Sequence, residues 1–181
     1  MNNIARPTLL AVLSLTSLAR LQPQSSDAAA PAPVFRDPFT LKLQTGNKHH
    51  YEEHFDKIPY VADNSVYLFA GENFGINVLI TGDEIKGVTY QKDAQNADVE
   101  FKFTQEKAGG RMMMILVIRS KLKRQLLFDA LMMVPGDNAL HKTSILPRPP
   151  ELPNLLHLET WPHPIVQLVL NNFRFSEEAS K

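Results

Sequence analysis

Residues 99–104 read Val-Glu-Phe-Lys-Phe-Thr, and this stretch decides the fold class. Apolar and polar side chains alternate strictly along it, as they do on the two faces of a half-buried strand. The same alternation runs through residues 39–44 (Phe-Thr-Leu-Lys-Leu-Gln) and, with one lapse at Leu79, through residues 74–80. Because a period of two recurs along the chain, we predict an all-β protein.

The neighbouring segments extend this pattern. Residues 81–84 (Thr-Gly-Asp-Glu) have the composition of a hairpin turn, and Gly87 predicts a bulge in the strand that follows. Residues 112–118 and 125–134 are apolar at nearly every position except Asp129, which is typical of strands covered on both faces. We predict that these two strands pair as a hairpin; a helix is the alternative for the second, because Leu, Ala and Met favour helices.

The last predicted strand covers residues 165–175, with a bulge at Asn171-Asn172 where the alternation changes phase. Residues 141–146 are a further short strand, and the four prolines of residues 147–153 predict a loop. In total, the sequence pattern predicts eight or nine strands. We expect a two-sheet antiparallel β-sandwich, immunoglobulin-like or related, with a small β-barrel as the alternative.

The composition excludes several classes of protein. The 181 residues contain no Cys, which removes disulfides, thiolate zinc sites and cysteine nucleophiles. Nineteen Lys and Arg balance nineteen Asp and Glu, so there is no overall attraction to nucleic acid or to anionic lipid. We expect neither a nucleic-acid partner nor insertion of the mature chain in a membrane.

The N-terminus reads as a secretory signal. A positively charged segment, Met1 to Arg6, precedes an apolar run that is too short to span a bilayer, and small residues follow that run. We predict a signal peptide at residues 1–29, an extended leader at 30–38, a single β-sandwich domain at 39–175 and a flexible tail at 176–181. The mature protein is then periplasmic or secreted.

A cluster of polar residues between the first strands is a candidate zinc site, formed by His49, His50, Glu53 and His54. On a helix, His50 and His54 would lie one turn apart and could bind one ion through their imidazole nitrogens. The alternative is a solvated connector. The H-x-x-E-H spacing lacks the long helix and the third ligand of a zinc protease, so we do not expect hydrolysis.

Five methionines form a second candidate, because thioethers suit Cu(I). They are Met112, Met113, Met114, Met132 and Met133. If residues 112–118 and 125–134 form a hairpin, Met112 faces Met132 on adjacent strands. Methionine is also an adaptable core residue, and packing is the simpler interpretation.

The proline-rich stretch 146–164 is the third candidate, because long loops are often functional. Arg148, Trp161 and His163 are the residues that we expect to contact a partner. The alternative is that the loop protects a sheet edge while Trp161 closes one end of the sandwich.

No catalytic pattern accompanies these candidates. The serines lack a nucleophile-elbow context, and no phosphate-binding glycine motif is present. We therefore expect a non-enzymatic binding or accessory module of the bacterial cell envelope, with no cofactor and with a protein or another envelope component as its partner. The alternative is a periplasmic metal-binding protein.

Overall fold

The computed structural model describes residues 32–46, 48–145 and 156–176. The predicted signal peptide and almost all of the predicted tail therefore lie outside the described residues, and every named element belongs to one compact unit, Pro31–Lys181. Within the described residues, no helix is long and apolar enough to cross a membrane. These residues form twelve strands and one short 3-10 turn: β1 (Phe39–Gln44), β2 (His50–Phe55), β3 (Val61–Ala62), β4 (Ser65–Leu68), β5 (Glu72–Thr81), β6 (Glu84–Gln91), η1 (Ala94–Asn96), β7 (Val99–Ala108), β8 (Arg111–Ser120), β9 (Leu126–Val134), β10 (Asp137–Thr143), β11 (His157–Trp161) and β12 (Gln167–Phe175).

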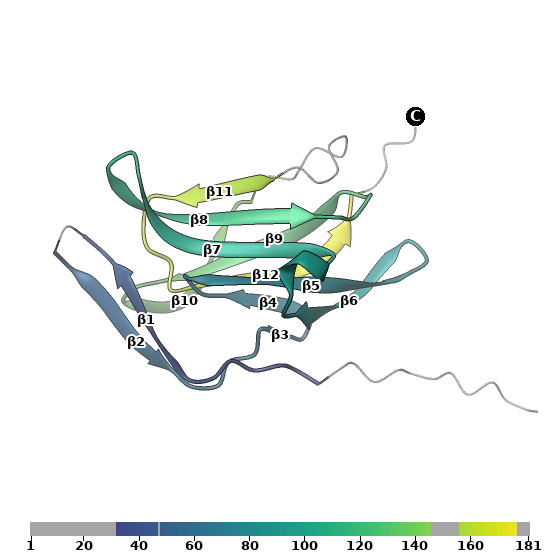
Figure 1. The fold of residues 1–181 in the computed structure, drawn as a ribbon, viewed down its shortest axis with the longest axis horizontal. Helices are drawn as coiled ribbons and strands as arrows, with labels where there is room; N and C mark the ends of the chain where they lie inside the picture. The colour runs from purple at the N-terminus through teal and green to yellow at the C-terminus, as the bar shows by residue number, and fades with distance from the viewer. Residues whose placement is uncertain (1–31, 47, 146–155, 177–181) are drawn as a thin grey trace, which may run out of the picture. The chain divides into compact units, whose positions relative to one another are not determined.

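Ten of these strands form two antiparallel sheets of five, and the other two, β1 and β2, form a hairpin. We call the first sheet, in the order β11-β8-β7-β5-β6, the β8 sheet; the second, in the order β10-β9-β12-β4-β3, is the β9 sheet. The two sheets are stacked (Figure 1), and within the described residues each ends in edge strands and does not close into a barrel. The predicted β-sandwich is confirmed, with more strands than the sequence pattern revealed.

The core lies between the sheets, and the alternating strands supply it. Val99, Phe101 and Phe103 of β7 are completely buried, whereas Glu100 and Lys102 point to the other face. Leu168 and Leu170 face them from β12 and are equally buried. Burial of each such side chain contributes about 1.5–3 kcal/mol, so the strand that decides the fold class is also a centre of its stability.

The two strands that are apolar on both faces do not pair with each other, which corrects the predicted hairpin. β8 pairs with β7 and β11 in one sheet, and β9 pairs with β10 and β12 in the other. A tight turn at Gly109-Gly110, where both residues have positive φ, joins β7 to β8 instead. β9 is a strand as predicted, and the helical alternative for residues 123–134 is excluded.

Both predicted bulges are present. The ladder between β5 and β6 shifts register next to Gly87, which pairs with Leu79. The ladder between β9 and β12 shifts between Asn171 and Arg174, and Asn172 adopts a φ of 53° there. An extra residue in one strand reverses the side-chain phase beyond it, as the sequence pattern indicated.

The β1–β2 hairpin includes a strand that the sequence analysis did not predict. The histidine-rich segment is strand β2, neither a connector nor a helix. Leu41 and Leu43 of β1 are buried. The side-chain amide of Gln105 on β7 binds the backbone of Gln44 twice, accepting from its N–H at 2.8 Å and donating to its carbonyl at 2.9 Å. The hairpin is thereby held against the sandwich.

Arg36 anchors the segment before β1. Only 4% exposed, it donates to both carboxylate oxygens of Glu72, at 2.5 and 2.8 Å, and to the carbonyl of Pro59 at 2.6 Å. Its guanidinium lies 4.0 Å from the ring centre of Tyr60, which in turn stacks on Tyr90 at 4.3 Å. Arg36 thus attaches the extended segment before Phe39 to the domain, while the neighbouring Val34 and Phe35 stay exposed.

Candidate functional site

The edge of the β9 sheet is incompletely paired. β10 follows β9 only as far as the pair Thr143–Ala130, and the chain then leaves the ladder. Residues 126–129 of β9 continue beyond that point, and within the described residues they pair only with β12. Among the described residues, one side of this length of backbone therefore has no strand partner for its hydrogen bonds.

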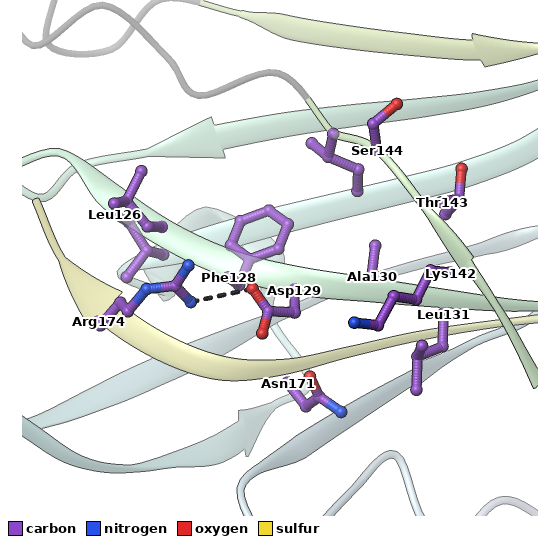
Figure 2. Close-up of a pocket in the computed structure, with 12 residues that line it drawn as sticks. Leu126, Phe128, Asp129, Ala130, Leu131, Lys142, Thr143, Ser144, Asn171 and Arg174 are labelled. Carbon is purple, nitrogen blue, oxygen red and sulfur yellow. Dashed lines mark ion pairs between the residues drawn. The ribbon is translucent and has the colours of Figure 1, made fainter.

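A pocket of about 660 Å³ lies where β10 diverges from β9 (Figure 2). Its volume falls within the range of about 300–1,000 Å³ that is common for ligand sites. Strands β9, β10 and β12 and the two residues after β10 form its walls. The lining residues are Leu126, Leu127, Phe128, Asp129, Ala130, Leu131, Lys142, Thr143, Ser144, Ile145, Asn171 and Arg174.

The strand register gives the pocket an apolar side and a polar side. Ala130 is buried in the core, so Phe128 and Leu126, two and four positions earlier, lie on the inner face of β9. Phe128 also packs on the ring of Phe173, 5.4 Å away between ring centres. Asp129 lies on the outer face, which carries the charged side chains. An occupant at this edge would meet apolar side chains on one face and charges on the other.

The polar side is organised around Asp129. One carboxylate oxygen accepts a hydrogen bond of 2.9 Å from the side-chain amide of Asn172. The other lies 3.1 Å from the guanidinium of Arg174 (Figure 2). Arg174 also donates to the backbone carbonyl of Asn172 at 2.8 Å. The Asn172 hydrogen bond, supported by the charges of Arg174 and Lys142, lowers the pKa of Asp129, so this carboxylate is ionised at neutral pH.

Lys142 is the unmatched charge of the pocket. It lies opposite Leu131 in the β9–β10 ladder, and its side chain points toward Asp129 (Figure 2). Within the described residues no side chain forms an ion pair or hydrogen bond with its ammonium group. Because Asp129 is already paired with Arg174, the pocket keeps one positive charge at its rim.

The structure describes two of the three residues predicted to bind a partner, Trp161 and His163. Trp161 is 7% exposed; its ring meets Phe103 edge-on at 6.3 Å, and its indole N–H donates to the hydroxyl of Thr143 at 2.8 Å. This hydrogen bond links β11, an edge strand of the β8 sheet, to β10, an edge strand of the β9 sheet. His163 is half-buried, with Nδ1 3.3 Å from the carbonyl of Pro164. Arg148 lies outside the described residues.

The structure also separates the predicted zinc ligands. Because β2 is extended, His50 and His54 are about 13 Å apart along the strand, too far to share an ion. Glu53 points to the opposite face, where it accepts a hydrogen bond from the hydroxyl of Tyr51, and His49 precedes the strand. In the part of the chain that the structure describes, no three His, Asp or Glu side chains are placed to hold a metal ion.

The methionine cluster is divided between the two sheets. Met112, Met113 and Met114 belong to β8, whereas Met132 and Met133 belong to β9. The predicted pairing of Met112 with Met132 on adjacent strands is therefore wrong. Met114 is completely buried and the two methionines of β9 pack against the same core, as expected for the packing interpretation.

The residues that line the pocket were not predicted from the sequence. Asp129 was the only visible signal, as the one charged residue within an apolar strand. Its partners Lys142 and Arg174 come from later strands, and only the register of β10 and β12 brings them to it.

The comparisons with known proteins give no further indication of function. No protein-family model, curated protein or solved structure matches the chain.

Proposed function

We propose that the protein is a non-enzymatic binding module of the bacterial cell envelope that accepts an extended peptide segment at residues 126–129 of β9. The observation that carries this proposal is a length of strand that has no second partner among the described residues and is bordered by a pocket. A peptide that adds a strand to a sheet needs free backbone groups for its hydrogen bonds and recesses for alternate side chains.

The dimensions agree with this mode of binding. Four residues of strand span about 13 Å, enough for a short peptide strand. A peptide strand at this edge would send alternate side chains toward Phe128 on the inner face and toward Lys142 on the outer face. The pocket thus offers two different environments, as strand addition requires for selectivity.

The cell envelope as the site of action rests on the N-terminal sequence, where a basic segment, an apolar run and small residues follow one another in the order of a secretory signal. The partner would then be the extended segment of another envelope protein.

The experiment uses a seven-residue peptide, acetylated and amidated, with valine at each even position, glutamine at the third and fifth, and serine elsewhere. Backbone amide exchange is followed by NMR with and without the peptide. We expect added protection within residues 126–129, because new ladder hydrogen bonds shield these amides. Phe128→Ala should weaken binding. Leu158→Ala, which shortens an exposed apolar side chain on the edge strand β11 of the other sheet, should leave binding unchanged.

Two outcomes would overturn the proposal. The first is peptide protection that lies elsewhere or is absent. The second is protection of residues 126–129 that increases with protein concentration in the absence of peptide, accompanied by a dimer in sedimentation, which would give this edge to a second copy of the chain.

A further inference from the structure

The charge distribution of the pocket indicates which peptides the β9 edge would select. Three charged side chains line it: Asp129, Lys142 and Arg174. Asp129 and Arg174 are paired at 3.1 Å and are held in place by Asn172 on the neighbouring bulge. These contacts leave one cation, Lys142, without a counterpart among the described residues.

The position of Lys142 matters as much as its charge. It lies opposite Leu131, just beyond the end of the unpaired length of β9, and on the outer face of the sheet. Successive residues of an added strand point alternately inward and outward, so only every second peptide residue can approach Lys142. The residues between them face Leu126 and Phe128, where a charge would lose its hydration without a partner.

We propose that the β9 edge selects extended peptides in which an acidic residue alternates with apolar residues, the acidic side chain pairing with Lys142 and the apolar side chains contacting Leu126 and Phe128. This inference rests on the proposed function and names its ligand class. Asp129 contributes to this selectivity indirectly. Its carboxylate is paired with Arg174, so Lys142 is the cation that contacts the peptide.

The test compares three versions of the heptapeptide, with glutamine, glutamate or lysine at the third and fifth positions, by isothermal titration in low salt. The glutamate peptide should bind about two- to fivefold more tightly than the glutamine peptide, and the lysine peptide should bind more weakly, because an exposed ion pair contributes about 0.2–1 kcal/mol. The preference should shrink as salt is added, since salt screens exposed charges.

Two substitutions assign the preference to one residue. Lys142→Gln should abolish the preference for glutamate, and Lys142→Glu should reverse it in favour of lysine. Lys92→Glu makes the same change in net charge at an exposed position after β6 and should keep the order of the wild-type protein. Thermal unfolding of each variant shows that the fold is intact.

The outcomes separate this inference from the proposed function. Equal binding of the glutamate and glutamine peptides, or a preference that survives Lys142→Glu, would overturn the acidic selectivity while leaving strand addition in place. Failure of all three peptides to protect residues 126–129 would overturn both.

Discussion

Arg36 and Lys142 are both basic residues set against apolar side chains, and the fold treats them in opposite ways. Arg36 is buried, its guanidinium meets both oxygens of Glu72, and the Tyr60 ring covers it. Lys142 is exposed at the rim of a pocket, and among the described residues its ammonium has no partner. In the Arg36 region (Arg36, Glu72, Tyr60 and Tyr90) the charge is paired within the molecule. In the Lys142 region (Lys142 and residues 126–129), neither the ammonium group nor one side of the strand has a partner among the described residues.

The difference teaches how to separate architecture from recognition in a protein without catalytic residues. A buried cation must be paired within the molecule, because an unpaired one would cost several kcal/mol. An exposed cation carries no such requirement, so it can be left for a partner at little cost in stability. Substitutions in the first region should therefore change stability, and substitutions in the second should change affinity.

The largest effect is expected when Arg36 is replaced. Arg36→Met leaves the carboxylate of Glu72 in the Arg36 region without its cation, which should lower the free energy of unfolding by about 3–5 kcal/mol. Urea unfolding measures the loss. The double variant Arg36→Met/Glu72→Met removes both charges and should recover most of it. A single variant as stable as the wild-type protein would mean that the pair does not anchor the segment before β1.

A smaller loss is expected beside the pocket. Thr143→Val keeps the shape of the side chain but deprives the indole N–H of Trp161 of its acceptor, which should lower the free energy of unfolding by about 1–3 kcal/mol. The chain has a single Trp, so its fluorescence reports on this junction directly. Thr143→Ser retains the hydroxyl and is the matched control; equal stability of the two variants would show that the hydrogen bond between the sheets is unimportant.

The Arg36 region should also respond to alkali. Burial, and then the neighbouring Tyr60, raise the pKa of Tyr90 above its ordinary value of 10.0. The folded state thus favours the neutral phenol of Tyr90. This preference stabilises the fold fully below pH 10, and the stabilisation is lost as the pH rises from there through the pKa of Tyr90 in the folded protein. Tyrosinate absorbance and unfolding experiments between neutral and strongly alkaline pH measure both effects. Tyr90→Phe should remove this part of the pH dependence; an unchanged profile would contradict the assignment.

The smallest change in stability is expected at Asp129. Asp129→Asn should alter the free energy of unfolding by no more than about 0.5 kcal/mol, because the ion pair is exposed. In the wild-type protein the pKa of Asp129 is lowered by folding. The ionised carboxylate therefore stabilises the folded state above the ordinary pKa of 3.8, and this stabilisation is lost as the pH falls through the lower pKa of the folded state. Affinity for the glutamate peptide should instead rise about twofold, since one negative charge has gone. A large loss of stability with no change in affinity would show that Asp129, like Arg36, has a structural role and no role in binding.

The sequence was sufficient for the fold class because a period of two is a local property. The bulges at Gly87 and Asn171-Asn172 were equally predictable, since each leaves a visible change of phase. The pairing of β8 and β9 was not, because strands that are apolar on both faces give no indication of which neighbour they join. Strand β2 was missed because four of its six residues are His or Glu, whose polar character conceals the alternation of Tyr51 and Phe55.

The candidate site was less predictable than the fold. The pocket depends on where β10 ends relative to β9, and no residue type marks that point. Its charged residues lie far apart in the sequence, so their meeting is a product of sheet order. Trp161 stood out by its rarity in the sequence, and its side chain is buried against Phe103 and bonded to Thr143.

The burial of Arg36 has a consequence for limited proteolysis. Trypsin must take the side chain of the residue before the cleaved bond into its own specificity pocket, and the guanidinium of Arg36 is held by Glu72 and by the carbonyl of Pro59. The Arg36–Asp37 bond can be cut only in molecules in which this segment has opened, whereas Lys123, exposed in the loop between β8 and β9, does not depend on that opening. The rate at which trypsin removes the N-terminal segment is therefore a direct measure of how often the domain releases it.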